Sequence, residues 1–213
     1  MAKAKRSWLT DKYWVTEFNY LEEVRKQFTL PEKVHIHDVT LREGEQAPHV
    51  VIKPDEKLRI YEALDDMGVH SVEILPIISS DDREVAKDLV KMRRNGHQAK
   101  VVFLCRWDQR EIDFAAETGA DGVVIECPGS PWFGQVVWGL DENQMIERLV
   151  KVAAHAKKNG LHTSVEPWEA TKAQMTFLER LYKSVGKDAG RGSEAVGCCK
   201  VGRPECNQGG IRR

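Results

Sequence analysis

Residues 37–46 read HDVTLREGEQ. They continue an apolar, β-branched run that begins at Val34, and this run predicts a β-strand over residues 34–41. The strand ends in two adjacent opposite charges, Arg42 and Glu43. Charged groups at buried strand ends cost several kcal/mol each unless they are paired or bound to a metal. The stretch therefore predicts a strand that delivers Arg42 and Glu43 either to an ion-pair network or to a functional site.

Downstream of this stretch, strand-like and helix-like segments alternate. Short Val- and Ile-rich segments predict strands at residues 34–41, 71–75, 100–105, 122–126 and 161–165, with a possible sixth at 194–199. The segments between them predict helices, most of which begin at a capping residue or proline and end near glycine. The last helix is expected to be capped by Thr171 and to run to Val185. Such alternation is typical of a parallel sheet, either an open doubly wound sheet or part of a (β/α)8 barrel.

The glycine motifs of the nucleotide-binding open sheets are missing. No G-x-G-x-x-G follows the first strand, and no G-x-x-x-x-G-K-S/T occurs in the sequence. This favours an α/β fold of the (β/α)8 TIM-barrel family, here an incomplete barrel of about five to six βα units. A complete barrel takes roughly 250 residues, and strands seven and eight have no candidate in this sequence. We expect a C-terminal truncation, and a shifted reading frame near the end or a genuinely short protein stays open as an alternative.

The domain organisation follows from this reading. Residues 34–186 form the expected partial-barrel catalytic domain, and residues 1–33 form an extension rich in aromatic residues that fall partly at helical spacing. Within the extension, Trp14, Phe18 and Leu21 would share one helix face with Phe28. Residues 187–213 are rich in glycine and cysteine and are expected to form a disordered tail. The tail's three cysteines include an adjacent pair and have no histidine nearby, which disfavours a zinc site.

Composition excludes several classes of partner. The chain of 213 residues has a net charge of −1, which gives no electrostatic footprint for nucleic acid. No apolar run approaches the ~20 residues of a membrane span, and no apolar stretch follows the basic N-terminus as it would in a signal peptide. Five scattered cysteines do not form a disulfide framework. We therefore expect a cytoplasmic protein with no nucleic-acid and no membrane partner.

Charged residues recur where the predicted strands end. Parallel α/β folds place their reactive groups at the carboxyl ends of the strands. Besides the pair after the first strand, the residues at this rim are Glu73, Arg106, Glu126 and Glu166. A structural ion pair would explain one of these groups, whereas the convergence of at least four carboxylates and two arginines favours a functional site.

The stretch at residues 37–46 resembles the signature of the DRE-TIM metallolyase superfamily, Asp-x-Thr-Leu-Arg-(Asp/Glu)-Gly-x-Gln. This superfamily includes isopropylmalate, homocitrate and citramalate synthases and HMG-CoA lyase. Residues 68–73 (GVHSVE) and 117–122 (ETGADG) add to the resemblance, which covers residues 34–186. It implies an acyl-CoA Claisen condensation in which the enolate of acetyl-CoA attacks a 2-oxo acid held by a divalent metal, Mg, Mn or Zn. It also implies homo-oligomers among full-length members.

The resemblance assigns roles to individual residues. It implies that Glu43 is a metal ligand, that Arg42 is the catalytic arginine that stabilises developing negative charge on oxygen, and that Glu73 orients the catalytic groups. The substrate-binding candidates are Gln46, Arg106 and Glu166. No general base can be assigned.

One pair of residues looks like a metal motif and is expected not to be one. His35 and His37 form a His-x-His, but the family's metal-binding His-x-His belongs on strand seven, which has no candidate here. Alternation along a strand through residues 34–41 would turn both histidines toward the helix layer and away from Arg42. We expect them to be structural.

The missing strands decide the expected activity. Without the second pair of metal ligands, we expect the chain as given to be inactive alone. Two other functions stay open: a lyase that cleaves a 3-hydroxyacyl-CoA, for which Cys206 is a candidate, and a non-catalytic partial barrel that binds a protein partner through residues 1–33.

Overall fold

The computed structural model describes residues 11–12, 14–28, 31 and 33–188, with side chains to residue 186. The chain divides into two compact units, Met1–His35 and Ile36–Arg213. The expected sixth strand and the cysteines of the tail lie outside the described residues.

Within residues 14–28, the longest described stretch of the first unit, the chain forms two short helical turns and no continuous helix. The turns are η1 (Glu17–Tyr20) and α1 (Glu22–Arg25). Leu21 separates them because its backbone is extended, with φ −61° and ψ 139°. Because the helical turns are interrupted at Leu21 and exclude Trp14 and Phe28, the single helix face expected for Trp14, Phe18, Leu21 and Phe28 is wrong. All four side chains are exposed.

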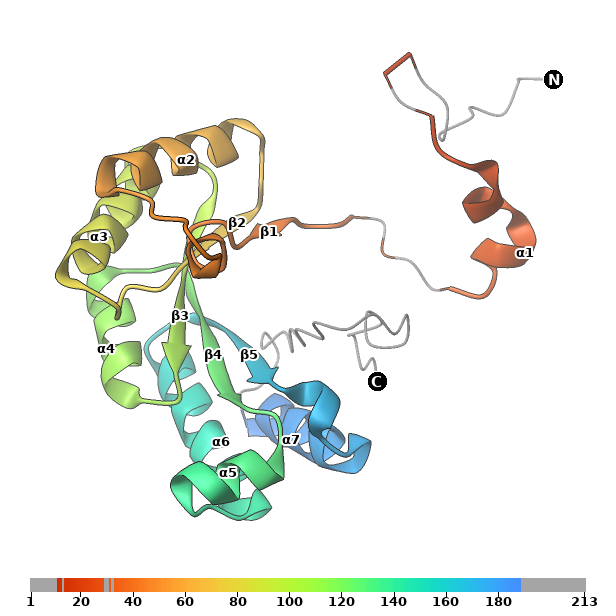
Figure 1. Ribbon diagram of the computed structural model, residues 1–213, viewed down its shortest axis with the longest axis vertical. Coiled ribbons are helices and arrows are strands. Elements are labelled where there is room, and N and C mark those ends of the chain that lie inside the picture. Colours follow the sequence, from red (N-terminus) through yellow and green to blue (C-terminus); the bar gives the residue numbers. More distant parts are fainter. Residues whose placement is uncertain (1–10, 13, 29–30, 32, 189–213) are drawn as a thin grey trace. The chain divides into compact units, whose positions relative to one another are not determined.

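The second unit is a sheet of five parallel strands in sequence order, which confirms an incomplete barrel (Figure 1). The strands are β1 (His37–Asp38), β2 (Ser71–Ile74), β3 (Lys100–Arg106), β4 (Gly122–Pro128) and β5 (His162–Trp168). β1 is much shorter than expected because a turn follows it, in which the backbone N–H groups of Arg42 and Glu43 both donate to the carbonyl of Val39. β4 and β5 are longer than expected, and they carry Glu126 and Glu166 inside the strands.

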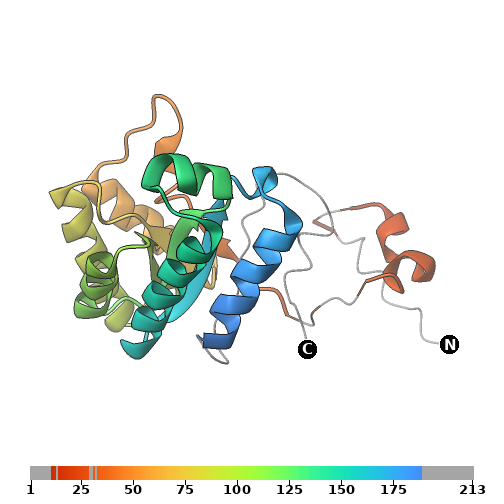
Figure 2. The ribbon, with the colours of Figure 1, turned by 90° about the horizontal axis from the view of Figure 1, so that it is seen from below.

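A helix follows each strand, and these helices cover one face of the sheet (Figure 1). They are α2 (Pro54–Asp66), α3 (Ser80–Arg94), α4 (Gln109–Thr118), α6 (Glu142–Lys158) and α7 (Met175–Asp188). Figure 2 shows α7 beside α6, against which it packs. Side-chain oxygens of Ser79, Asp108 and Asp141 accept backbone N–H groups in the first turns of α3, α4 and α6 and so cap these helices. The sequence predicts the caps at Asp108 and Asp141, but it predicts Ser80 or Asp81 as the cap of α3, and there the prediction is wrong by one or two residues.

Three short elements differ from the expectation. η2 (Gly44–Gln46) follows the turn after β1, and α5 (Pro131–Trp138) follows β4. The third, η3 (Ala170–Lys172), contains Thr171, so the prediction that Thr171 caps the last helix is wrong. α7 begins instead at Met175.

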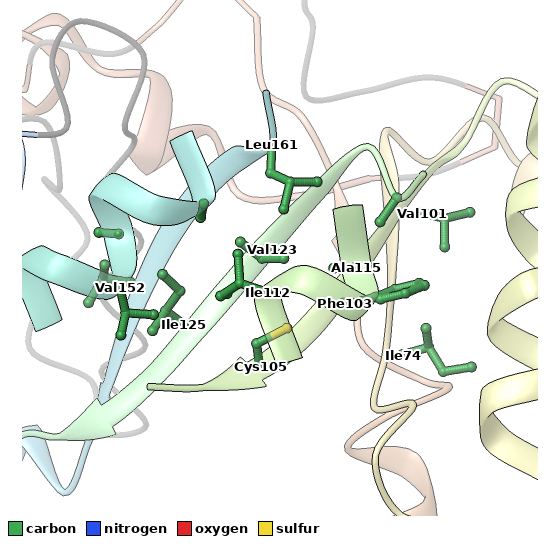
Figure 3. Packing of buried hydrophobic residues seen from close by; sticks show 14 of the residues in the cluster. Ile74, Val101, Phe103, Cys105, Ile112, Ala115, Val123, Ile125, Val152 and Leu161 are labelled. Atoms are coloured by element: carbon green, nitrogen blue, oxygen red, sulfur yellow. The ribbon is translucent and has the colours of Figure 1, made fainter. Parts of the chain in front are cut away.

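Alternate residues of the strands point to opposite faces. Val101, Phe103 and Cys105 of β3 pack with Ile112 of α4 in the main core between sheet and helices (Figure 3). Val102 and Leu104 belong to a small second cluster with Val124 on the opposite face. By the same alternation, Glu73, Arg106, Glu126 and Glu166 stand on this second face, away from the helices.

None of the helices among the described residues has the length and apolar character that crossing a membrane requires.

Candidate active site

Arg42 is the centre of a charged cluster on the face of the sheet away from the helices. Its side chain is only 8% exposed. Its Nε donates to Oε1 of Glu73 at 2.5 Å, one terminal nitrogen contacts the carboxylate of Glu43, and the other lies 3.5 Å from Oε2 of Glu166. We call these four residues the Arg42 cluster. The structure thus brings together four of the six site residues predicted from the sequence.

The turn after β1 explains how the cluster forms. The turn carries Arg42 back over the neighbouring strand β2, whose Glu73 is 1% exposed. A buried carboxylate without partners would cost several kcal/mol, and here each oxygen of Glu73 has one partner. The cluster is therefore a built feature of the fold and not a surface ion pair.

His37 belongs to the same network, which corrects the sequence prediction. Its Nε2 lies 2.8 Å from Oε2 of Glu73, and its Nδ1 lies 2.7 Å from Oγ of Ser71. The expectation that His37 faces the helix layer, opposite to Arg42, is wrong. Strand alternation does not extend past Asp38, because β1 ends there and a turn redirects the chain.

Arg42 keeps its charge in this setting. Burial by itself would lower the pKa of the guanidinium, but the carboxylates of Glu73, Glu166 and Glu43 outweigh burial and raise the pKa above its ordinary value. A fixed cation beside several carboxylates can donate hydrogen bonds to an anionic oxygen without moving a proton.

Glu126 is a neighbour of the cluster that the sequence placed at the rim but not among the site candidates. Parallel pairing sets it opposite Glu166 of β5 and Arg106 of β3. Burial, together with the charges of Glu166, Glu73 and Glu43, raises the pKa of Glu126, and Arg42 opposes this.

Replacing Glu126 with glutamine is expected to stabilise the fold at neutral pH. The raised pKa means that the folded state holds the proton more tightly, so the wild-type chain loses stability as pH rises from 4.5 through the raised value. In urea unfolding at pH 7, the variant should have a higher free energy of unfolding than the wild type. This difference should vanish below pH 4.5. A variant that is less stable at pH 7 would show that the ionised carboxylate is favourably paired.

Arg106 and Gln46 are not brought to the Arg42 cluster. The side chain of Arg106 is 63% exposed, and its Nε donates to Oε1 of Glu111 in α4 at 2.7 Å. Glu111 also accepts a hydrogen bond from the backbone N–H of Arg106, so α4 binds both the side chain and the backbone at the end of β3. Gln46 is exposed at the end of η2. Their substrate-binding roles stay predictions.

A second buried ion cluster, which sequence reasoning missed, holds the loop after the Arg42 turn. Lys57 of α2 is 5% exposed, and its Nζ lies 2.7 Å from Glu45 and 2.5 Å from Asp82 of α3. Burial would lower the pKa of Lys57, but the two carboxylates more than compensate and raise it. η2 is thereby tied to two helices of the scaffold. A lysine in the first turn of an amphipathic helix gives no signal of burial.

The two described cysteines do not offer a nucleophile. Cys105 and Cys127 are buried, and burial raises the pKa of both thiols far above the ordinary value. Both therefore remain protonated at neutral pH and unreactive.

The described residues do not fit a metal ion by themselves. The side chain of Glu43 is 30% exposed and its carboxylate contacts Arg42. Across the part of the chain that the structure describes, no three His, Cys, Asp or Glu side chains are arranged to hold a metal. A single carboxylate shared with an arginine is a poor ligand set.

Titration with Mn²⁺ should therefore show only weak binding, with a dissociation constant above about 1 mM. Glu43→Gln should leave this binding unchanged within error. Electron paramagnetic resonance of free Mn²⁺ measures both. Micromolar binding that Glu43→Gln removes would contradict this reading.

A half-barrel of parallel βα units, with a buried arginine and carboxylates on the face away from the helices, places the chain in the TIM-barrel class of α/β folds. The profile of the HMGL-like family matches residues 33–202. The chain belongs to this family, as the signature at residues 37–46 predicts.

Curated relatives include synthases. The homocitrate synthase AksA of Methanopyrus kandleri is 29% identical over 84% of this chain and 45% of that protein. The (R)-citramalate synthase CimA of Methanocaldococcus jannaschii is 33% identical over 73% of this chain and 32% of that protein. The chain thus spans less than half the length of these two relatives.

Solved structures confirm the fold. The HMG-CoA lyase of Brucella melitensis superposes with a TM-score of 0.62 at 18% identity, over 82% of this chain and 65% of that chain. The HMG-CoA lyase from Bacillus subtilis gives a TM-score of 0.59 at 20% identity, over 74% of this chain and 56% of that chain.

Proposed function

We propose that the chain is part of a cytoplasmic enzyme that condenses an acyl-CoA onto a 2-oxo acid. Acetyl-CoA is the expected acyl donor. The observation that carries this proposal is the buried Arg42, fixed by Glu73 on the face of the sheet away from the helices. The named synthases among the relatives support the same reaction class. The family's divalent metal, Mg, Mn or Zn, would need ligands beyond those described here.

The role of Arg42 follows from its geometry. Glu73 holds Nε, so the plane of the guanidinium is set and its terminal nitrogens face Glu43 and Glu166. In a condensation, negative charge develops on the ketone oxygen of the 2-oxo acid as the carbon nucleophile attacks. A fixed guanidinium that donates to this oxygen stabilises the charge without reorganisation.

Binding of 2-oxo acids tests this role on the chain as it exists. Pyruvate, 2-oxoglutarate and 2-oxoisovalerate should shift the NMR signals of residues around the Arg42 cluster at millimolar concentration. Arg42→Lys keeps the charge but loses the planar donor pair, so it should weaken binding at least about tenfold. Arg59→Lys on the exposed face of α2 is the matched control and should change nothing.

Two results would contradict the proposal. One is the absence of any binding by the wild-type chain at tens of millimolar ligand. The other is binding that Arg42→Lys leaves unchanged, since the ligand would then lie elsewhere.

Activity assays distinguish the condensing enzyme from the two alternative functions. We expect negligible release of free CoA from acetyl-CoA with any of these acids and Mn²⁺, because the described residues do not supply a metal site. Release of acetyl-CoA from a 3-hydroxyacyl-CoA would favour the lyase instead, although Cys206 lies outside the described residues. A metal-independent complex with another protein that survives Arg42→Lys would favour a non-catalytic role.

A further inference from the structure

Glu73 is held from two sides, and only one of its partners belongs to the signature of the family. Oε1 accepts from Nε of Arg42 at 2.5 Å, and Oε2 pairs with Nε2 of His37 at 2.8 Å. The carboxylate is 1% exposed, so water does not replace a lost partner easily. The position of Arg42 therefore depends on what holds the other oxygen of Glu73.

The pairing of β1 with β2 places His37 where it can do this. His37 lies opposite Ser71 in the parallel register, and Ser71 and Glu73 are two residues apart on the same face of β2. The imidazole spans both side chains, with Nδ1 at 2.7 Å from Oγ of Ser71. Both nitrogens of the ring are thus engaged, and the ring cannot turn without breaking a hydrogen bond.

The chemistry of the partners assigns the direction of these hydrogen bonds. The carboxylate of Glu73 accepts from Arg42, so it also accepts from Nε2–H of His37. In the neutral ring, Nδ1 then accepts a hydrogen bond from the hydroxyl group of Ser71. The chain of contacts runs from Ser71 through His37 and Glu73 to Arg42.

We propose that His37 is a positioning residue that fixes the guanidinium of Arg42 through Glu73. The benefit of this positioning rests on the proposed function, since a fixed guanidinium matters only if an anionic ligand binds there. The positioning itself is inferred from the contacts of His37, Glu73 and Arg42 alone. Without a donor at Oε2, the carboxylate can rotate, and the hydrogen bond to Nε of Arg42 weakens.

The test is the exchange rate of the Arg42 Nε–H proton, followed by NMR in uniformly ¹⁵N-labelled chain and assigned by its loss in Arg42→Lys. His37→Phe keeps a ring and removes both hydrogen bonds, and it should speed exchange at least about tenfold. His37→Gln restores a donor and an acceptor, and it should keep exchange within about threefold of wild type. His162→Gln, at the exposed start of β5, is the control and should change nothing.

Unchanged exchange in a folded His37→Phe variant would overturn the proposal, as would equal loss in His37→Gln and His37→Phe. If His37→Phe does not fold, Ser71→Ala takes its place, because it removes only the hydrogen bond that orients the ring. If the Arg42 Nε–H proton exchanges faster in Ser71→Ala than in His37→Gln, the result supports the proposal. Equal exchange rates in the two variants overturn it.

These results are distinguishable from those on function. Failure of 2-oxo acids to bind would remove the proposed function and leave the exchange rates as expected. Conversely, normal binding by a His37→Phe variant with unchanged exchange would keep the function and remove the role of His37.

Discussion

Replacing Arg42 with methionine is expected to lower the free energy of unfolding by about 3–5 kcal/mol. The substitution removes the guanidinium that contacts Glu43, Glu73 and Glu166 and keeps an unbranched apolar stem. Breaking a buried ion pair from one side leaves an uncompensated charge, and here three carboxylates lose their common partner. Equilibrium unfolding in urea measures the change.

The matched control is Arg59→Met. Arg59 pairs with Asp55 on the exposed face of α2, where both side chains are about two-thirds exposed or more, at 68% and 72%. Pairs of this kind contribute about 0.3–0.5 kcal/mol, so the control should barely move the midpoint. Equal effects of the two substitutions would show that solvent already screens the Arg42 cluster.

Replacing Lys57 with methionine should cost about 3 kcal/mol. The ammonium of Lys57 is buried between Glu45 and Asp82, and its stem packs in the same place, so methionine keeps the packing and removes the charge. The two carboxylates are then left close together without a cation. Unfolding in urea again gives the magnitude.

Lys87→Met is the control for this second change, because Lys87 pairs with Glu84 on the exposed face of α3. It should cost less than about 0.5 kcal/mol. Adding Glu45→Gln and Asp82→Asn to Lys57→Met should recover part of the lost stability, since the stranded charges are removed. If the triple variant is no more stable than Lys57→Met, the loss comes from packing and not from charge.

The sequence predicted the architecture because local signals agreed with one another. The capping residues Asp108 and Asp141, and the glycine at the end of α4, lie where the pattern indicated, whereas α3 is capped by Ser79 and not by Ser80 or Asp81. The sequence also placed Glu126 and Glu166 near the carboxyl ends of β4 and β5, where they lie opposite each other. These strands are long enough for their apolar pattern to be recognised in the sequence.

The site was less predictable where the chain leaves regular structure. The face of His37 could not be read from alternation, because β1 is two residues long and a turn then reverses the direction of the chain. Arg106 ends β3 as predicted, but Glu111 of the following helix binds its side chain. Lys57 gives no sign in the sequence that two distant carboxylates enclose it.

The buried thiols of Cys105 and Cys127 have a practical consequence. They lie on neighbouring strands, β3 and β4, with their side chains in the core between the sheet and the helices, so neither is accessible while the helices stay packed on the sheet. An alkylating reagent therefore modifies them only when the helix layer separates transiently from the sheet. The rate at which each cysteine is alkylated thus reports how often the core opens at that strand.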